Sequence, residues 1–72
     1  MPCQAAIDLA TLAIQADIAK DHEKAISLYV RAADELEKAA RTFPQEAAEM
    51  RAKAKEYRDR ANVLTQQAQA DK

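Results

Sequence analysis

The stretch AAEMRAKAKEYRDRANVLTQQA, residues 47–68, decides the fold of this chain. Its apolar residues recur at alternating steps of three and four, which places their side chains along one stripe of an α-helix. A stripe of this kind packs against other helices, so the stretch predicts a long helix in a bundle. The stripe consists of Ala47, Met50, Ala54, Tyr57, Ala61, Leu64 and Ala68.

The same spacing occurs upstream, and Pro44 separates the two stretches, since proline disfavours a helix at the preceding residue and suits the first turn of the next. Asp21 is the predicted N-cap of this upstream helix, and residues 4–19 form a further helical segment. We therefore predict an all-α, antiparallel up-down-up three-helix bundle in a single domain, 1–72, with helices over about 4–19, 22–42 and 45–69. The upstream stripe consists of Ile26, Tyr29, Ala33, Leu36, Ala40 and Phe43.

Composition supports helices and excludes several classes of function. The 72 residues include 18 alanines and no glycine, so a phosphate-binding glycine loop is excluded. A net charge of −1 gives no overall attraction to nucleic acid, and charges interrupt every apolar run before it could span a membrane. The single Cys3 cannot form an internal disulfide, and we expect it to be an exposed thiol in a cytoplasmic protein.

Catalytic and metal-binding groups do not form a recognisable set. His22 is the only histidine and Ser27 the only serine, while the acidic residues are spread as helix-surface charges. We therefore expect no enzymatic activity, no cofactor and no metal site in this chain.

Residues 4–19 carry more apolar surface than two neighbouring helices could cover. One stripe holds Ala6, Leu9, Ala13 and Ala16, a second holds Ile7, Ala10, Ile14 and Ile18, and Leu12 lies on another flank. A helix that is apolar over most of its circumference is either buried or has surface left for a partner. Because a domain this small buries little, we expect a partner surface here.

Two further predictions concern side-chain partners. We expect Tyr29, Phe43, Met50 and Tyr57 to pack in the core, because they lie on the apolar stripes. Acid-before-base pairs four residues apart are predicted to stabilise the exposed helix faces. These pairs are Asp34–Lys38, Glu37–Arg41, Glu49–Lys53 and Glu56–Arg60.

Two blocks of sequence resemble the MIT (microtubule-interacting and trafficking) domain family. The first is AIDL at 6–9 with Ala13 and Ala16, followed by EKAISLY at 23–29. The second is Lys53 with EYRDRA at 56–61 and Leu64, which is similar to the family pattern YxxRAxxL. Together the blocks cover about residues 5–66.

The resemblance implies a three-helix module that binds C-terminal tails of ESCRT-III subunits. Such modules bring an attached AAA ATPase, deubiquitinase, protease or kinase to endosomal or other membranes under remodelling. The domain would reach the membrane only through its partners. In the family one type of tail docks as a helix between the second and third helices, and another lies extended between the first and third.

We expect the groove between the first and third helices to dominate. Arg58 replaces a leucine of the family's ATPase members, and Asn62 replaces an acid, so the second groove is more basic and less apolar. The rotation of the first helix stays open, so both of its flanks are candidates. In the groove between the first and third helices, the first helix would contribute either Leu9, Leu12, Ala13 and Ala16 or Ile14 and Ile18. The third helix would contribute Lys53, Tyr57, Arg60 and Leu64. The groove between the second and third helices would be lined by Leu28, Ala32, Ala39, Arg51, Lys55, Arg58 and Asn62.

Two other functions are alternatives. The surplus apolar surface of residues 4–19 could form a helical dimer, although we expect the isolated domain to be a monomer. The basic residues of the last helix could instead dock on acidic polymers such as tubulin tails.

Overall fold

The computed structural model describes residues 4–70, which form three α-helices and one short 3-10 turn. The elements are α1 (Gln4–Ile18), α2 (His22–Thr42), η1 (Pro44–Glu46) and α3 (Ala47–Ala70). The predicted all-α class and the three-helix bundle are confirmed. Cys3, expected to be an exposed thiol, lies outside the described residues.

The turns between the helices follow from a few local residues. Lys20 has a positive φ of 63°, which reverses the chain after α1. The Asp21 side chain then accepts a hydrogen bond from the backbone N–H of Lys24, which confirms the predicted N-cap of α2. Pro44 opens η1, so α3 begins through a tighter turn at Ala47, two residues later than predicted.

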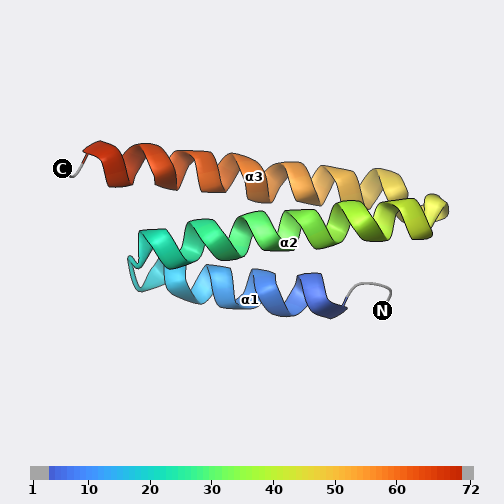
Figure 1. The fold of residues 1–72 in the computed structure, drawn as a ribbon, viewed down its shortest axis with the longest axis horizontal. Helices are drawn as coiled ribbons and strands as arrows, with labels where there is room; N and C mark the ends of the chain where they lie inside the picture. Colours follow the sequence, from blue (N-terminus) through green and yellow to red (C-terminus); the bar gives the residue numbers. More distant parts are fainter. Residues whose placement is uncertain (1–3, 71–72) are drawn as a thin grey trace.

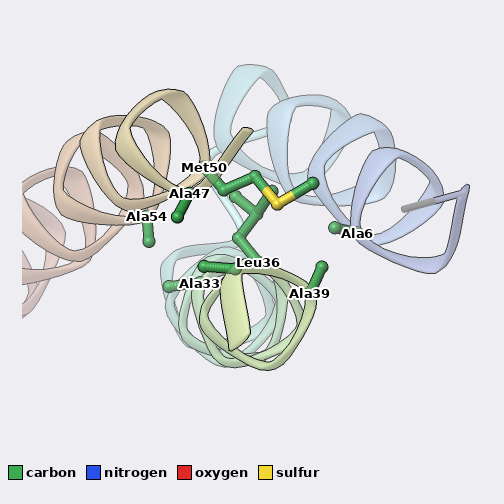
Figure 2. Packing of buried hydrophobic residues seen from close by; sticks show 8 residues of the cluster. Ala6, Ala33, Leu36, Ala39, Ala47, Met50 and Ala54 are labelled. Atoms are coloured by element: carbon green, nitrogen blue, oxygen red, sulfur yellow. The ribbon is translucent and has the colours of Figure 1, made fainter. Parts of the chain in front are cut away.

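Helix α2 lies between the other two and packs along both of them (Figure 1). Within the described residues, α1 and α3 make little direct backbone contact with each other. Seen along the helices, both lie on the same side of α2 (Figure 2). The bundle is therefore V-shaped in section, with α2 at the vertex (Figure 2). A small cavity lined by all three helices opens between α1 and α3, and we call the surface around it the groove.

The core is built largely from alanines, which lets the helix backbones approach closely. The buried residues of α1 are all alanines: Ala6, Ala10, Ala13 and Ala16. Larger side chains from α2 and α3, such as Leu36 and Met50, fill the centre at one end, where Ala6 meets them from α1 (Figure 2). Leu28, Tyr29 and Leu64 fill the other end. Helix α1 thus contributes little volume to the core.

One predicted core residue lies elsewhere. Tyr29 and Met50 are buried and Tyr57 packs against the core, as predicted. Phe43 is 40% exposed, so its predicted place in the core is wrong. Because Phe43 follows the last turn of α2, its backbone has left the helix and no longer continues the apolar stripe.

Candidate functional site

The isoleucines of α1 form an exposed apolar stripe, of which Ile7 borders the groove. Ile7, Ile14 and Ile18 lie within about 40° of one another around the helix axis, at about 100° per residue. Their exposed fractions are 38%, 47% and 77%. Thr11 lies on the same stripe, and its hydroxyl donates to the Ile7 carbonyl oxygen at 2.9 Å. We call these four residues the isoleucine stripe.

A small cavity opens where this stripe meets α3. Its volume is about 120 Å³, and it is lined by residues of all three helices. Ala6 and Ile7 come from α1, Leu36 from α2, and Lys53 and Tyr57 from α3. A drug-sized ligand needs roughly 300–1,000 Å³, so the cavity suits a single aliphatic side chain of a larger partner.

The groove is closed towards the α1–α2 turn by a polar network. Arg60 of α3 donates two hydrogen bonds of 2.8 Å to the Asp17 carboxylate of α1. The Tyr29 hydroxyl of α2 donates to the same carboxylate at 3.0 Å. Asp17 therefore connects all three helices. The Arg60 guanidinium holds the pKa of Asp17 below its ordinary value of 3.8, while burial raises the pKa of Tyr29.

The α3 rim of the groove is charged, unlike the α1 rim. Lys53 forms an exposed ion pair with Glu56 at 3.2 Å, and its Nζ lies 6.0 Å from the centre of the Tyr57 ring. The Tyr57 ring in turn lies 5.8 Å from that of Tyr29. The predicted rim residues Lys53 and Tyr57 thus line the cavity, whereas Arg60 is engaged by Asp17 at the closed end.

The other side of α3 is held to α2 by ion pairs. Arg58 bonds Asp34 at 2.7 Å and also bonds Glu37. These acids neutralise Arg58, one of the basic residues that the sequence places in the second groove. Arg51, Lys55 and Asn62 are exposed. Leu28, Ala32 and Ala39, the other residues predicted there, are buried in the bundle and offer no free surface.

The structure resolves the rotation of α1 that the sequence left open. Ala13, Ala16 and Leu64 are core residues, and Leu9 packs against the same cluster. Leu12 is 48% exposed but lies about 140° around the helix from Ile7. Ile14 and Ile18 therefore lie on the Ile7 side of α1, and Leu12 does not.

Sequence reasoning missed three lining residues of the cavity: Ala6, Ile7 and Leu36. Ile7 shares a stripe with Ile14 and Ile18, so its spacing was a usable signal. Leu36 gave no such signal, because it lies on the apolar stripe of α2, which predicts a core position. Only the V-shaped arrangement of the helices opens a cavity beside it.

The described residues contain no cluster of three or more potential metal ligands. Over the same residues, none of the helices is long and apolar enough to cross a membrane. The features on this surface are an apolar stripe, a cavity for one side chain and a charged rim. They define a helical protein-interaction module.

Comparison with protein families agrees with this class. The family model described as MIT (microtubule interacting and transport) domain matches residues 3–66. The chain therefore belongs to the MIT domain family, which confirms the resemblance noted in the sequence. No match was found among curated proteins or among solved structures.

Proposed function

We propose that this domain binds C-terminal tail segments of ESCRT-III subunits in the groove between α1 and α3. The observation that carries the proposal is the cavity beside the isoleucine stripe, because it combines an apolar lining with access from outside. Membership of the MIT family supplies the class of partner. The domain is the recruiting part of the interaction and carries no catalytic role.

The size and shape of the groove favour a peptide segment over a compact ligand. The cavity accepts one anchoring side chain, while Ile14 and Ile18 extend the apolar surface beyond it. From Ile7 to Ile18 the stripe runs for about 16 Å at 1.5 Å per residue. A few anchors of this kind usually dominate binding to such surfaces.

The α2–α3 side is a poorer site for an apolar segment. The Arg58 ion pairs with Asp34 and Glu37 cross this surface, and a partner would have to displace or cover them. Leaving charged groups unpaired under a bound segment costs free energy. The difference between the two sides supports the α1–α3 groove as the binding site.

Titration of the ¹⁵N-labelled domain with ESCRT-III tail peptides tests the proposal. Binding is expected to shift the amide signals around Ile7, Ile14 and Tyr57. Ile14→Asp should weaken binding at least about tenfold, since a charge would enter the apolar contact. Leu12→Asp is the matched control, because Leu12 and Ile14 are almost equally exposed at 48% and 47% but lie on different faces.

Two outcomes contradict the proposal. One is a set of shifts confined to the outer faces of α2 and α3, and the other is an equal effect of the two aspartate variants. Sedimentation of the free domain at tens of micromolar tests the alternative of self-assembly: a dimer that Ile14→Asp dissociates would assign the stripe to a second copy instead.

We further propose that the domain recruits an attached enzyme to endosomal or other remodelling membranes from the cytoplasm, through these tails alone. A fluorescent fusion of the domain should collect where ESCRT-III assembles in cells. The fusion carrying Ile14→Asp should stay diffuse, and the Leu12→Asp fusion should behave like the parent. Equal recruitment of both variants contradicts this role for the groove.

A further inference from the structure

We infer that the outer surface shared by α1 and α2 is a second interaction site, which binds an acidic segment of a partner protein. The inference goes beyond the proposed function and does not depend on it, because this surface lies on another side of α1 from the isoleucine stripe. Three features lead to it: a second cavity, an exposed leucine in line with that cavity, and a row of basic side chains beside them.

The second cavity opens between the N-terminal end of α1 and the C-terminal end of α2. Its volume is about 250 Å³, compared with about 120 Å³ for the cavity between α1 and α3. Ala5 lines it from α1, Ala39 from α2, and Phe43, which is 40% exposed, from the turn after α2. A site for a drug-sized ligand has roughly 300–1,000 Å³, so this cavity suits one large apolar side chain of a partner.

Leu12 extends the apolar surface along α1. It follows Ala5 by seven residues, so the two side chains lie about 20° apart around the helix and about 10 Å apart along it. Leu12 is 48% exposed, and the core leaves it uncovered. It remains a control for binding at the isoleucine stripe, because it lies about 140° around the helix from Ile7.

Three basic residues form a row on α2 beside this surface. Lys38 lines the second cavity, and Arg31 and Lys24 precede it at steps of seven, so all three lie within about 40° around α2. Because α1 and α2 run antiparallel (Figure 1), the step from Lys38 back to Arg31 matches the step from Ala5 forward to Leu12. Arg31 therefore lies across from Leu12. We call the second cavity, Leu12 and this row the α1–α2 face.

The basic row is available to the carboxylates of a partner. Within residues 4–70 neither Lys24 nor Arg31 takes part in an ion pair, and both are exposed. Lys38 pairs with Glu35 at 3.4 Å, but its side chain is 71% accessible, and such exposed pairs are weak. Successive cations stand about 10 Å apart along the helix. A segment with carboxylates at this spacing complements the row while an apolar side chain enters the cavity.

The acidic residues on the same face favour a peptide over an anionic membrane as the occupant. Asp8 lies about 40° around α1 from Leu12, and Glu35 lies between Arg31 and Lys38 on α2. With three basic residues, these two carboxylates leave a net charge of only +1 on the face. An anionic lipid surface would meet both signs, and its attraction to so few charges is weak. A peptide can place its carboxylates opposite the cations alone.

The test titrates the ¹⁵N-labelled chain with an acidic peptide of about 12 residues, in which glutamate occupies every third position, since three residues of extended chain span about 10 Å. Serine fills the other positions, except for one phenylalanine near one end. A peptide with glutamine for glutamate and one with alanine for phenylalanine are the controls for the partner. On the protein, Arg31→Glu and Leu12→Ser are compared with Lys55→Glu and Val63→Ser, which alter exposed residues of α3.

Binding is expected to shift the amide signals around Leu12 and Arg31, and not those around Ile14. Arg31→Glu should weaken binding about fivefold, since an attraction is replaced by a repulsion, and added salt should weaken it as well. Leu12→Ser should cost about threefold, and loss of the peptide phenylalanine about fivefold. Lys55→Glu and Val63→Ser should bind like the parent.

Several outcomes would overturn the inference. Equal effects of Arg31→Glu and Lys55→Glu, equal affinity for the glutamine peptide, or shifts confined to the cavity between α1 and α3 each contradict it. Phosphatidylserine vesicles that bind through Arg31 while the acidic peptide does not bind would assign the face to a membrane instead. A dimer that Leu12→Ser dissociates would assign it to a second copy. The ESCRT-III tail titration is separate, so either proposal can fail while the other stands.

Discussion

The two sides of α3 meet their neighbours in different ways. Towards α2, alanines allow close approach, and Arg58 bonds Asp34 and Glu37 across the surface. Towards α1, a cavity opens at Tyr57, and the helices are joined further along by Arg60 and Asp17. One side is sealed, and the other is open over part of its length. The comparison teaches that a first helix whose buried residues are all alanines leaves its larger apolar side chains, Ile7, Leu12, Ile14 and Ile18, exposed.

The largest expected effect comes from removing the side chain that fills the core at the closed end of the groove. Leu64 is fully buried, so Leu64→Ala should lower the free energy of unfolding by about 2–4 kcal/mol through lost burial and a residual cavity. Urea denaturation followed by circular dichroism measures the change. The neighbouring exposed Val63→Ala is the control, and a similar loss in both variants would contradict the assigned core.

The next effect concerns the network that joins α1 to the rest of the bundle. Asp17→Asn should destabilise the domain by about 1–2 kcal/mol, because the bidentate charge-assisted pair with Arg60 is lost and the partly buried hydrogen bond from Tyr29 is weakened. Hydrogen exchange should show the loss mainly as faster opening of α1. Asp8→Asn, on the exposed face of the same helix, should have little effect. Uniform loosening of all three helices would argue against a local clasp.

The pH dependence of stability isolates the same carboxylate. The pKa of Asp17 is lower in the folded chain than its ordinary value of 3.8, so the folded state binds this proton less readily than the unfolded state. Its stabilising contribution is complete above that value and is lost as the pH falls through the folded pKa. Asp17→Asn should therefore flatten the stability curve below about pH 4. An unchanged slope in this variant contradicts the prediction.

A smaller effect is expected from the tyrosine that supports the network. Tyr29→Phe removes only the hydroxyl bond to Asp17 and keeps the buried ring, so a loss of about 0.5–1.5 kcal/mol should result. Thermal denaturation at neutral pH measures it. The double variant with Asp17→Asn should lose less stability than the sum of the two single losses, because both substitutions affect the same hydrogen bond. Full additivity would show that the two groups act separately.

The smallest effect should come from the ion pairs between α2 and α3. Arg58 and its two acidic partners are all more than one third exposed, and solvent screens such pairs, so Arg58→Ala should cost only about 0–1 kcal/mol. Its stability should approach that of the parent at high salt. A loss as large as that of Asp17→Asn would contradict this ranking. It would mean that the α2–α3 ion pairs stabilise the domain as much as the Asp17 network does.

Local patterns were sufficient to predict the fold. Steps of three and four, the Asp21 cap and Pro44 depend on interactions within a few residues, so the helices could be located from the sequence with boundaries close to those observed. Phe43 shows where this fails, because the chain leaves the helix just before the proline and the periodic pattern no longer places the side chain.

The ionic partners were decided at the tertiary level. The sequence predicted Asp34, Glu37 and Arg60 in pairs within their own helices, yet Asp34 and Glu37 meet Arg58, and Arg60 meets Asp17. Spacing along one helix shows which side chains could meet, but a neighbouring helix can present a better-placed partner. Asp17 is such a partner, because its carboxylate accepts two hydrogen bonds from the Arg60 guanidinium.

By itself the sequence determined the helices, their antiparallel order, the surplus of apolar surface on α1 and membership of the MIT family. The tertiary structure alone decided that Ile7, and not Leu12, borders the cavity, and that Leu36 forms part of the cavity lining. The physical reason is that periodicity defines the stripes of a helix, whereas the rotation that selects one stripe depends on packing. Here small alanines settle α1 against α2 and leave its isoleucines exposed.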